Sequence, residues 1–129
     1  MILGLCAALL LGLAGIAQAQ GDATRGAALA ANRSQGLCVL CHALPGQPTA
    51  LQGTIGPALD GVGARLNPEA LRQRLLAPER FNPDTVMPSY GRVYSAADAM
   101  QRVPVARQGK PLLAPDQIDD LVAYLGSLK

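Results

Sequence analysis

Hydrophobic residues recur at helical spacing in separate stretches of this chain. The clearest stretch is 115–128, where apolar positions three and four residues apart predict a helix with one buried face: Ile118, Leu121, Val122, Leu125 and Leu128. Acidic residues occupy the N-terminal part of its polar face, where they suit the helix dipole: Asp116, Asp119 and Asp120. Near the other end of the chain, 22–32 predicts a short alanine-rich helix with Asp22 as its N-cap.

A third helix is predicted to begin after Asn67. This residue is a good N-cap, and the proline that follows it fits the first helical position. Leu71 and Leu75 then lie on one face, and Pro78 ends the helix.

The remaining segments have no sustained pattern. Gly and Pro are frequent in 43–63, which predicts a loop, and 81–92 is a second, polar loop. From 93 to 113 we expect one helical turn at 96–101 and an extended loop at 103–110. No stretch alternates with a strand period, so the sequence predicts a single all-α domain of short helices and long loops.

The first nineteen residues have the pattern of a signal peptide. Residues 2–16 are apolar and small, and they end in Ala17-Gln18-Ala19, an A-x-A cleavage pattern. A membrane anchor is the alternative, but the run is shorter than the ~20 apolar residues that a spanning helix needs. Cys6 lies in this leader without a convincing lipobox, which leaves lipid anchoring as a weaker alternative. We therefore predict a signal peptide at 1–19, cleaved near Ala19, and a domain at 20–129 without a membrane span.

The run Cys38-Val39-Leu40-Cys41-His42 follows the first predicted helix. It is the attachment signature of c-type haem, in which both sulfurs bond to the porphyrin and the histidine binds the iron. A structural zinc site needs four ligands, yet the one remaining cysteine lies in the leader. A thioredoxin-type dithiol needs alternating strands and helices, which this pattern lacks. We predict one covalently bound haem c, and export to the bacterial periplasm fits it because bacterial c-type haem is attached outside the cytoplasm.

Composition agrees with a core built around a cofactor. Three tyrosines, one phenylalanine and no tryptophan make a thin core, to which a haem would add apolar bulk. Eleven basic and nine acidic residues give no case for nucleic-acid binding. With Cys6 removed and the other two cysteines attached to haem, no thiol remains to act as a nucleophile.

A sixth iron ligand must come from a residue other than histidine, because His42 is the only histidine. A methionine thioether is the usual soft partner in c-type haems. Met87 lies in a polar loop bracketed by prolines and is our preferred ligand, ahead of Met100 or an open site. A role for Met87 as a filler of gaps in the core is the competing interpretation.

Pro57 lies in a Gly-rich turn that can pass the proximal side of a haem. Its carbonyl would accept a hydrogen bond from the ligating histidine, fixing the ring and raising its basicity. An ordinary surface turn explains the spacing equally well.

Three blocks together resemble a known family: GLCVLCH at 36–42, GTIGP at 53–57 and NPDTVMPSY at 82–90. They are similar to the SoxX family of sulfur-oxidation cytochromes, which are class I cytochromes c. The tail GKPLL at 109–113, leading into DDLVAYL at 119–125, resembles the same family. The resemblance covers nearly the whole chain after the leader.

The resemblance implies an all-α, class I cytochrome c-like fold wrapped around one haem. It implies a periplasmic monohaem subunit that pairs with a SoxA-like dihaem or monohaem cytochrome in a heterodimer. In that family the pair oxidatively joins thiosulfate to a cysteine of the SoxYZ carrier, with the sulfur chemistry on SoxA. The SoxX haem relays electrons to a small acceptor cytochrome, so this chain would be the electron-transfer subunit of an L-cysteine S-thiosulfotransferase complex and not catalytic alone.

Carried over by position, the family's haem site maps onto five residues of this chain. Cys38 and Cys41 would bind the haem covalently, His42 and Met87 would be its axial ligands, and Pro57 would accept the hydrogen bond of the histidine.

Two other functions remain open from the residues. One is a free-standing class I cytochrome c that shuttles electrons to an oxidase or another acceptor. Docking to acidic partners would then favour a lysine ring, whereas the chain has Lys110 and Lys129 alone. The other is a small thiol enzyme or sensor without haem.

Overall fold

The computed structural model describes residues 21–95 and 109–129. Within these ranges the α-helices are α1 (Ala23–Ala31), α2 (Val62–Arg65), α3 (Pro68–Leu76) and α5 (Pro115–Ser127). Short 3-10 turns are η1 (Cys38–Leu40), η2 (Thr49–Leu51) and η3 (Pro78–Arg80). The described part of the chain has one isolated antiparallel bridge, between Val93 and Pro111, and no strand. The all-α prediction is therefore confirmed.

All three predicted helices form, and two of them have the side-chain caps that the sequence predicts. The Asp22 carboxylate accepts a hydrogen bond from Arg25 N at 2.9 Å, and the Asn67 side chain accepts one from Ala70 N at 2.8 Å. These bonds satisfy backbone donors that have no partner within a first helical turn. Helix α5 begins at Pro115, as predicted, and ends one residue before the predicted limit.

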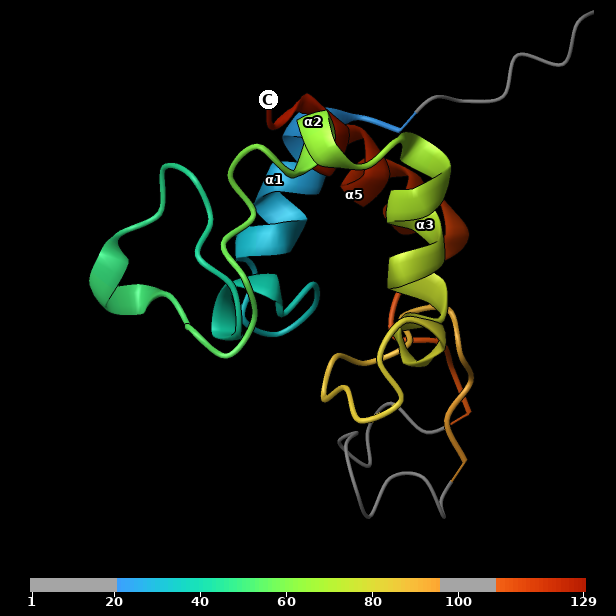
Figure 1. Ribbon diagram of the computed structural model, residues 1–129. Helices are drawn as coiled ribbons and strands as arrows, with labels where there is room; N and C mark the ends of the chain where they lie inside the picture. Colours follow the sequence, from blue (N-terminus) through green and yellow to red (C-terminus); the bar gives the residue numbers. More distant parts are fainter. Residues whose placement is uncertain (1–20, 96–108) are drawn as a thin grey trace, which may run out of the picture.

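Helices α1 and α5 pack against each other, and α2 and α3 also pack on α5 (Figure 1). The hydrophobic core includes both predicted apolar faces: Leu71, Leu75, Ile118, Leu121, Val122 and Leu125 are all buried. The four helices thus form a frame at one end of the molecule, and the loops that carry the candidate site extend from this frame.

Asp120 is buried between α1 and α5, although the sequence placed it on the polar face. It is 5% exposed and accepts hydrogen bonds from Asp22 N at 2.7 Å and from Nε and Nη2 of Arg25 at 2.8 and 2.7 Å. The Arg25 guanidinium and the Asp22 amide hold the pKa of Asp120 below its usual range, because both favour the charged carboxylate. Asp120 therefore fastens the first helix of the described chain to the last.

Two loops leave this frame and carry the candidate site. In Figure 1 the segment after η1 extends beyond one side of α1, and the segment after η3 lies beyond the end of α3. The predicted loop at 43–63 is correct for most of its length, but it contains η2 and ends in the first residues of α2.

Several predicted features lie outside the described residues. They are the leader at 1–19, the helical turn at 96–101, Met100 and most of the extended loop at 103–110. Among the residues that the structure does describe, no helix is both long and apolar enough to cross a membrane.

Candidate haem site

The two cysteines and the histidine lie on one tight turn directly after α1. Leu37 adopts a left-handed conformation, with φ of 64°, and it directs the backbone into η1. The carbonyl of Cys38 then accepts hydrogen bonds from Cys41 N at 3.1 Å and from His42 N at 2.8 Å. A non-glycine residue at positive φ costs roughly 1–3 kcal/mol and occurs often at functional sites. Here it immediately precedes the first candidate attachment residue.

The environment of Cys38 does not favour a reactive thiolate. The residue is buried, and burial raises the pKa of its thiol to about 11. Reactive dithiols have depressed pKa values in electropositive, partly exposed surroundings. In the described ranges, no group of three or more His, Cys, Asp or Glu side chains gathers as a metal site would require. Both observations weaken the dithiol and zinc alternatives.

The His42 ring is fixed by the backbone of the loop that follows it. Its Nδ1 lies 2.6 Å from the carbonyl oxygen of Pro57. A carbonyl can only accept, so Nδ1 carries the proton and donates, which leaves Nε2 with its lone pair free. A Cβ on Gly56 would lie 2.3–2.8 Å from three atoms of this ring, so the ring rests directly on the glycine backbone.

Three backbone hydrogen bonds hold this loop, residues 52–59, against the attachment turn, residues 36–42, and the residue that follows it. Gly53 N donates to Val39 O at 2.9 Å, Gly56 N donates to Cys41 O at 2.7 Å, and Leu59 N donates to Ala43 O at 3.0 Å. The Gln52 side chain closes the loop internally by accepting from Leu44 N at 2.8 Å. The position of Pro57 relative to His42 is therefore set by the local backbone.

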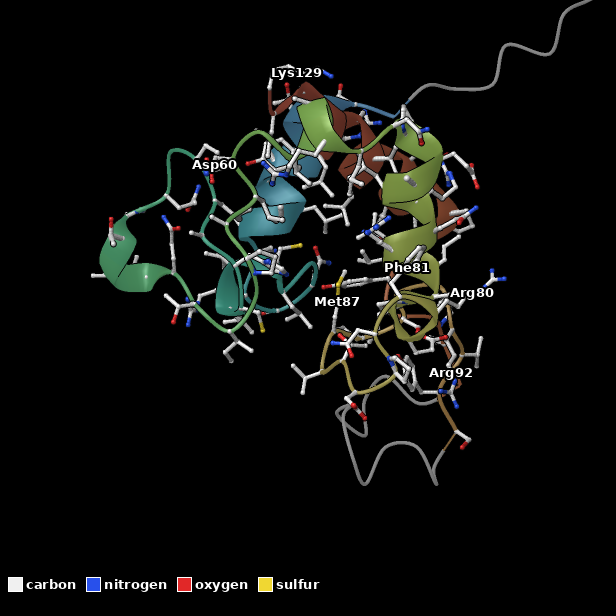
Figure 2. The ribbon with its side chains drawn as sticks, viewed as in Figure 1. Asp60, Arg80, Phe81, Met87, Arg92 and Lys129 are labelled. Atoms are coloured by element: carbon white, nitrogen blue, oxygen red, sulfur yellow. The ribbon has the colours of Figure 1, made fainter. Side chains whose placement is uncertain are left out.

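Met87 comes from the loop after α3. Its backbone N–H donates to Thr85 Oγ1 at 3.1 Å, and its side chain is partly buried against the core. In Figure 2 this side chain points from the loop toward the centre of the molecule, on the same side as the ring of Phe81. The Cζ atom of Arg74 lies over the Phe81 ring, 4.2 Å from the centroid of that ring. The arrangement gives Met87 an inward orientation, which both the ligand and the core-filler interpretations require.

Tyr90 was missed by the sequence analysis. It is 3% exposed, and its hydroxyl donates to Gly36 O at 2.6 Å. This hydrogen bond joins the loop at 81–92, which carries Met87, to the start of the attachment turn. A tyrosine three residues after Met87 in a polar loop was the available signal, but its partner lies 54 residues away. Burial is the main cause that raises the pKa of Tyr90, so its hydroxyl remains protonated.

The site residues fit a covalently held porphyrin. The donor set combines two thiols without a disulfide and one imidazole whose free nitrogen is Nε2. Exposed apolar residues also lie close to the candidate residues in the sequence: Leu40 precedes Cys41, Ile55 lies two residues before Pro57, and Val86 precedes Met87. Ile55 is 73% exposed and Val86 is 63% exposed. A large apolar ring brought between these segments offers such side chains a partner.

Comparisons with known proteins agree with this fit. The family model described as Cytochrome c matches residues 23–129. The chain is also similar to a solved structure described as the crystal structure of SoxXA from P. pantotrophus. The two chains are 32% identical, the match covers 87% of this chain and 85% of that chain, and the TM-score is 0.69. No curated protein sequence matches.

Proposed function

The chain belongs to the cytochrome c family as a SoxX-type class I cytochrome with covalently bound haem c, and on this premise we propose that it is the electron-relay subunit of a sulfur-oxidising complex. The similarity to a SoxXA structure over 87% of the chain is the observation that carries the proposal. Its partner would be a SoxA-like cytochrome, and the two would work in the bacterial periplasm after cleavage of the leader near Ala19.

The reaction to be served is the oxidative coupling of thiosulfate to a cysteine of a SoxYZ carrier. Joining a thiol to thiosulfate forms one sulfur–sulfur bond and releases one proton and two electrons. A bound haem would supply one-electron chemistry between ferric and ferrous iron, so each coupling would require two transfers through this chain. The electrons leave to a small acceptor cytochrome.

The absence of a spare thiol supports placing the sulfur chemistry on the partner. Cys38 and Cys41 are the cysteines of the chain after the leader, and both are assigned to haem attachment. The role of this chain is then to bind the haem, hold its ligands and present it to the partner.

We assign the haem ligands by combining the motif with the geometry. Cys38 and Cys41 would form the thioether bonds, and His42 would bind the iron through Nε2, because Nδ1 donates to Pro57 O at 2.6 Å. That hydrogen bond fixes the ring orientation and raises the basicity of the ligating nitrogen. Met87 would be the second axial ligand, and its inward orientation is compatible with that role (Figure 2).

Isolation of the native protein tests the proposed partner. We expect it to copurify with a second haem cytochrome, and its haem to be reduced by thiosulfate when that partner and the carrier are both present. Two results would together support the free-standing shuttle and overturn the proposal. The protein would be a stable monomer in analytical ultracentrifugation, and an unrelated dehydrogenase would reduce its haem as fast as thiosulfate does with the partner and carrier.

Replacement of Met87 tests the axial ligand. We expect Met87→Ala to lose the charge-transfer band of methionine-ligated ferric haem and to become high-spin or to bind a substitute ligand. Met100→Ala is the matched control and should keep the band. If the band survives in the Met87 variant and disappears in the Met100 variant, the assignment is wrong. A pyridine haemochrome spectrum, which should show one haem c per chain, separates both outcomes from a haem-free protein.

A further inference from the structure

Tyr90 connects four parts of the structure that meet around the candidate site. Its backbone N–H donates to Leu75 O at the end of α3, at 2.9 Å, and its carbonyl accepts from Leu113 N just before α5, at 3.0 Å. Its hydroxyl crosses to Gly36 O at 2.6 Å. The residue is therefore fixed at its backbone to the helical frame and at its side chain to the attachment turn.

The acceptor of this hydroxyl is itself held firmly. A Cβ on Gly36 would lie 2.0 Å from Leu29 O, so the Gly36 backbone lies directly against α1. The same Gly36 carbonyl lies 3.5 Å from the Cys38 sulfur, within reach of its S–H. A thioether has no S–H, so after haem attachment Tyr90 is the side-chain donor that this carbonyl keeps among the described contacts.

From these contacts we infer that Tyr90 is a positioning residue for the axial methionine: its hydroxyl links the loop that carries Met87 to the turn that carries Cys38 and His42, and so sets how readily another ligand displaces Met87 from the iron. The inference rests on the proposed function, because it takes Met87 as the ligand. It is separate from haem attachment and from partner binding.

The hydrogen bond from Tyr90 to Gly36 can affect methionine ligation because the two axial ligands come from different segments. His42 is fixed to the attachment turn by its own loop, whereas Met87 lies in the loop at 81–92. That loop is held at its end by the backbone hydrogen bonds of Tyr90 and by the Ser89 hydroxyl, which donates to Glu79 at 2.8 Å. Displacement of Met87 requires that loop to move away, and Tyr90 lies three residues after Met87. Breaking its buried hydrogen bond to Gly36 adds to the free energy of that movement.

Imidazole binding to the ferric holoprotein measures this free energy, since imidazole competes with methionine for the iron. We expect Tyr90→Phe, which keeps the ring and removes the hydroxyl, to bind imidazole about tenfold more tightly, the change expected from the loss of one buried hydrogen bond. Tyr124→Phe removes a hydroxyl from α5 and should leave the affinity unchanged. A general loss of stability would lower the melting temperature of either variant without changing the imidazole affinity.

A third variant separates the link to Gly36 from stiffness within the loop. The Tyr94 hydroxyl contacts Ser89 N at 2.8 Å and Ser89 O at 3.1 Å, so Tyr94→Phe loosens the loop but keeps the link. We expect it to change the imidazole affinity less than Tyr90→Phe does. Equal effects of the two variants, or an unchanged affinity in Tyr90→Phe, would overturn the inference.

The wild-type protein supplies the same test if Tyr90→Phe does not fold. We expect the Tyr90 hydroxyl proton to exchange slowly with solvent in the ferric protein, and about tenfold faster when imidazole occupies the iron. Equal exchange rates in the two states would overturn the inference. If the wild-type protein lacks the methionine charge-transfer band altogether, the proposed ligation by Met87 fails instead, so the two failures are distinguishable.

Discussion

Gly56→Ala is the most direct test of how the histidine is held. The added methyl carbon would lie 2.3 Å from Cε1, 2.6 Å from Nδ1 and 2.8 Å from Nε2 of His42, whereas ordinary contact begins near 3.4 Å. The ring must therefore retreat by about 1 Å. Gly56 does not have a positive φ, so alanine fits its backbone and the clash with the ring is the perturbation.

The expected cost has two parts. Overpacking of this kind costs roughly 1–3 kcal/mol. A retreat of about 1 Å also breaks the hydrogen bond from His42 Nδ1 to Pro57 O, since that bond is 2.6 Å long and hydrogen bonds fail beyond about 3.5 Å, which adds about 1 kcal/mol. The free energy of unfolding of the holoprotein should fall by about 2–4 kcal/mol in chemical denaturation.

The absorption spectrum reports the same displacement at the haem. We expect a larger high-spin fraction in Gly56→Ala, because the imidazole no longer has its fixed orientation. Gly126→Ala is the matched control: this glycine lies in α5 with open space around it, so alanine should stabilise the protein by roughly 0.5–1 kcal/mol. A Gly56→Ala protein with wild-type stability and spectrum would refute the proposed contact.

Two further predictions concern the whole fold. Cys38→Ser combined with Cys41→Ser should leave a largely unfolded chain, because the haem supplies core volume and two tethers; a cooperative, native-like circular dichroism melt would contradict this. Asp120→Asn should destabilise the protein by about 2 kcal/mol at neutral pH through loss of charge-assisted hydrogen bonds. The folded pKa of Asp120 is lowered, so its contribution is present above the unfolded pKa near 4 and is lost as pH falls further. The stability gap between wild type and Asp120→Asn, from denaturation at several pH values, should therefore shrink below about pH 4.

Local signals account for most of what the sequence predicts correctly. The caps at Asp22 and Asn67 depend on residues within one helical turn, and the apolar stripe of α5 depends on spacing alone. The attachment motif is likewise a contiguous run. Each of these features is complete within a short window, so no tertiary information is needed to read it.

The missed features depend on partners far along the chain. Asp120 looks like an exposed acid near a helix start until Arg25 packs beside it, and Tyr90 looks like a loop residue until it reaches Gly36. The predicted loop at 43–63 includes the first two residues of α2, but Gly63 N donates to Leu128 O at 2.8 Å, so the C-terminus holds this helical turn. Tertiary contacts decide the structure in all three cases.

The contact between the first and last helices of the described chain also decides when the helical frame can be completed during folding. Asp22 N and the Asp120 carboxylate are separated by 98 residues, and α1 has its main packing partner in α5. Contacts of such long sequence separation form late, because the loop between them must be closed first. Until α5 packs on α1, the turn at 38–42 therefore lacks the complete helical frame beside it.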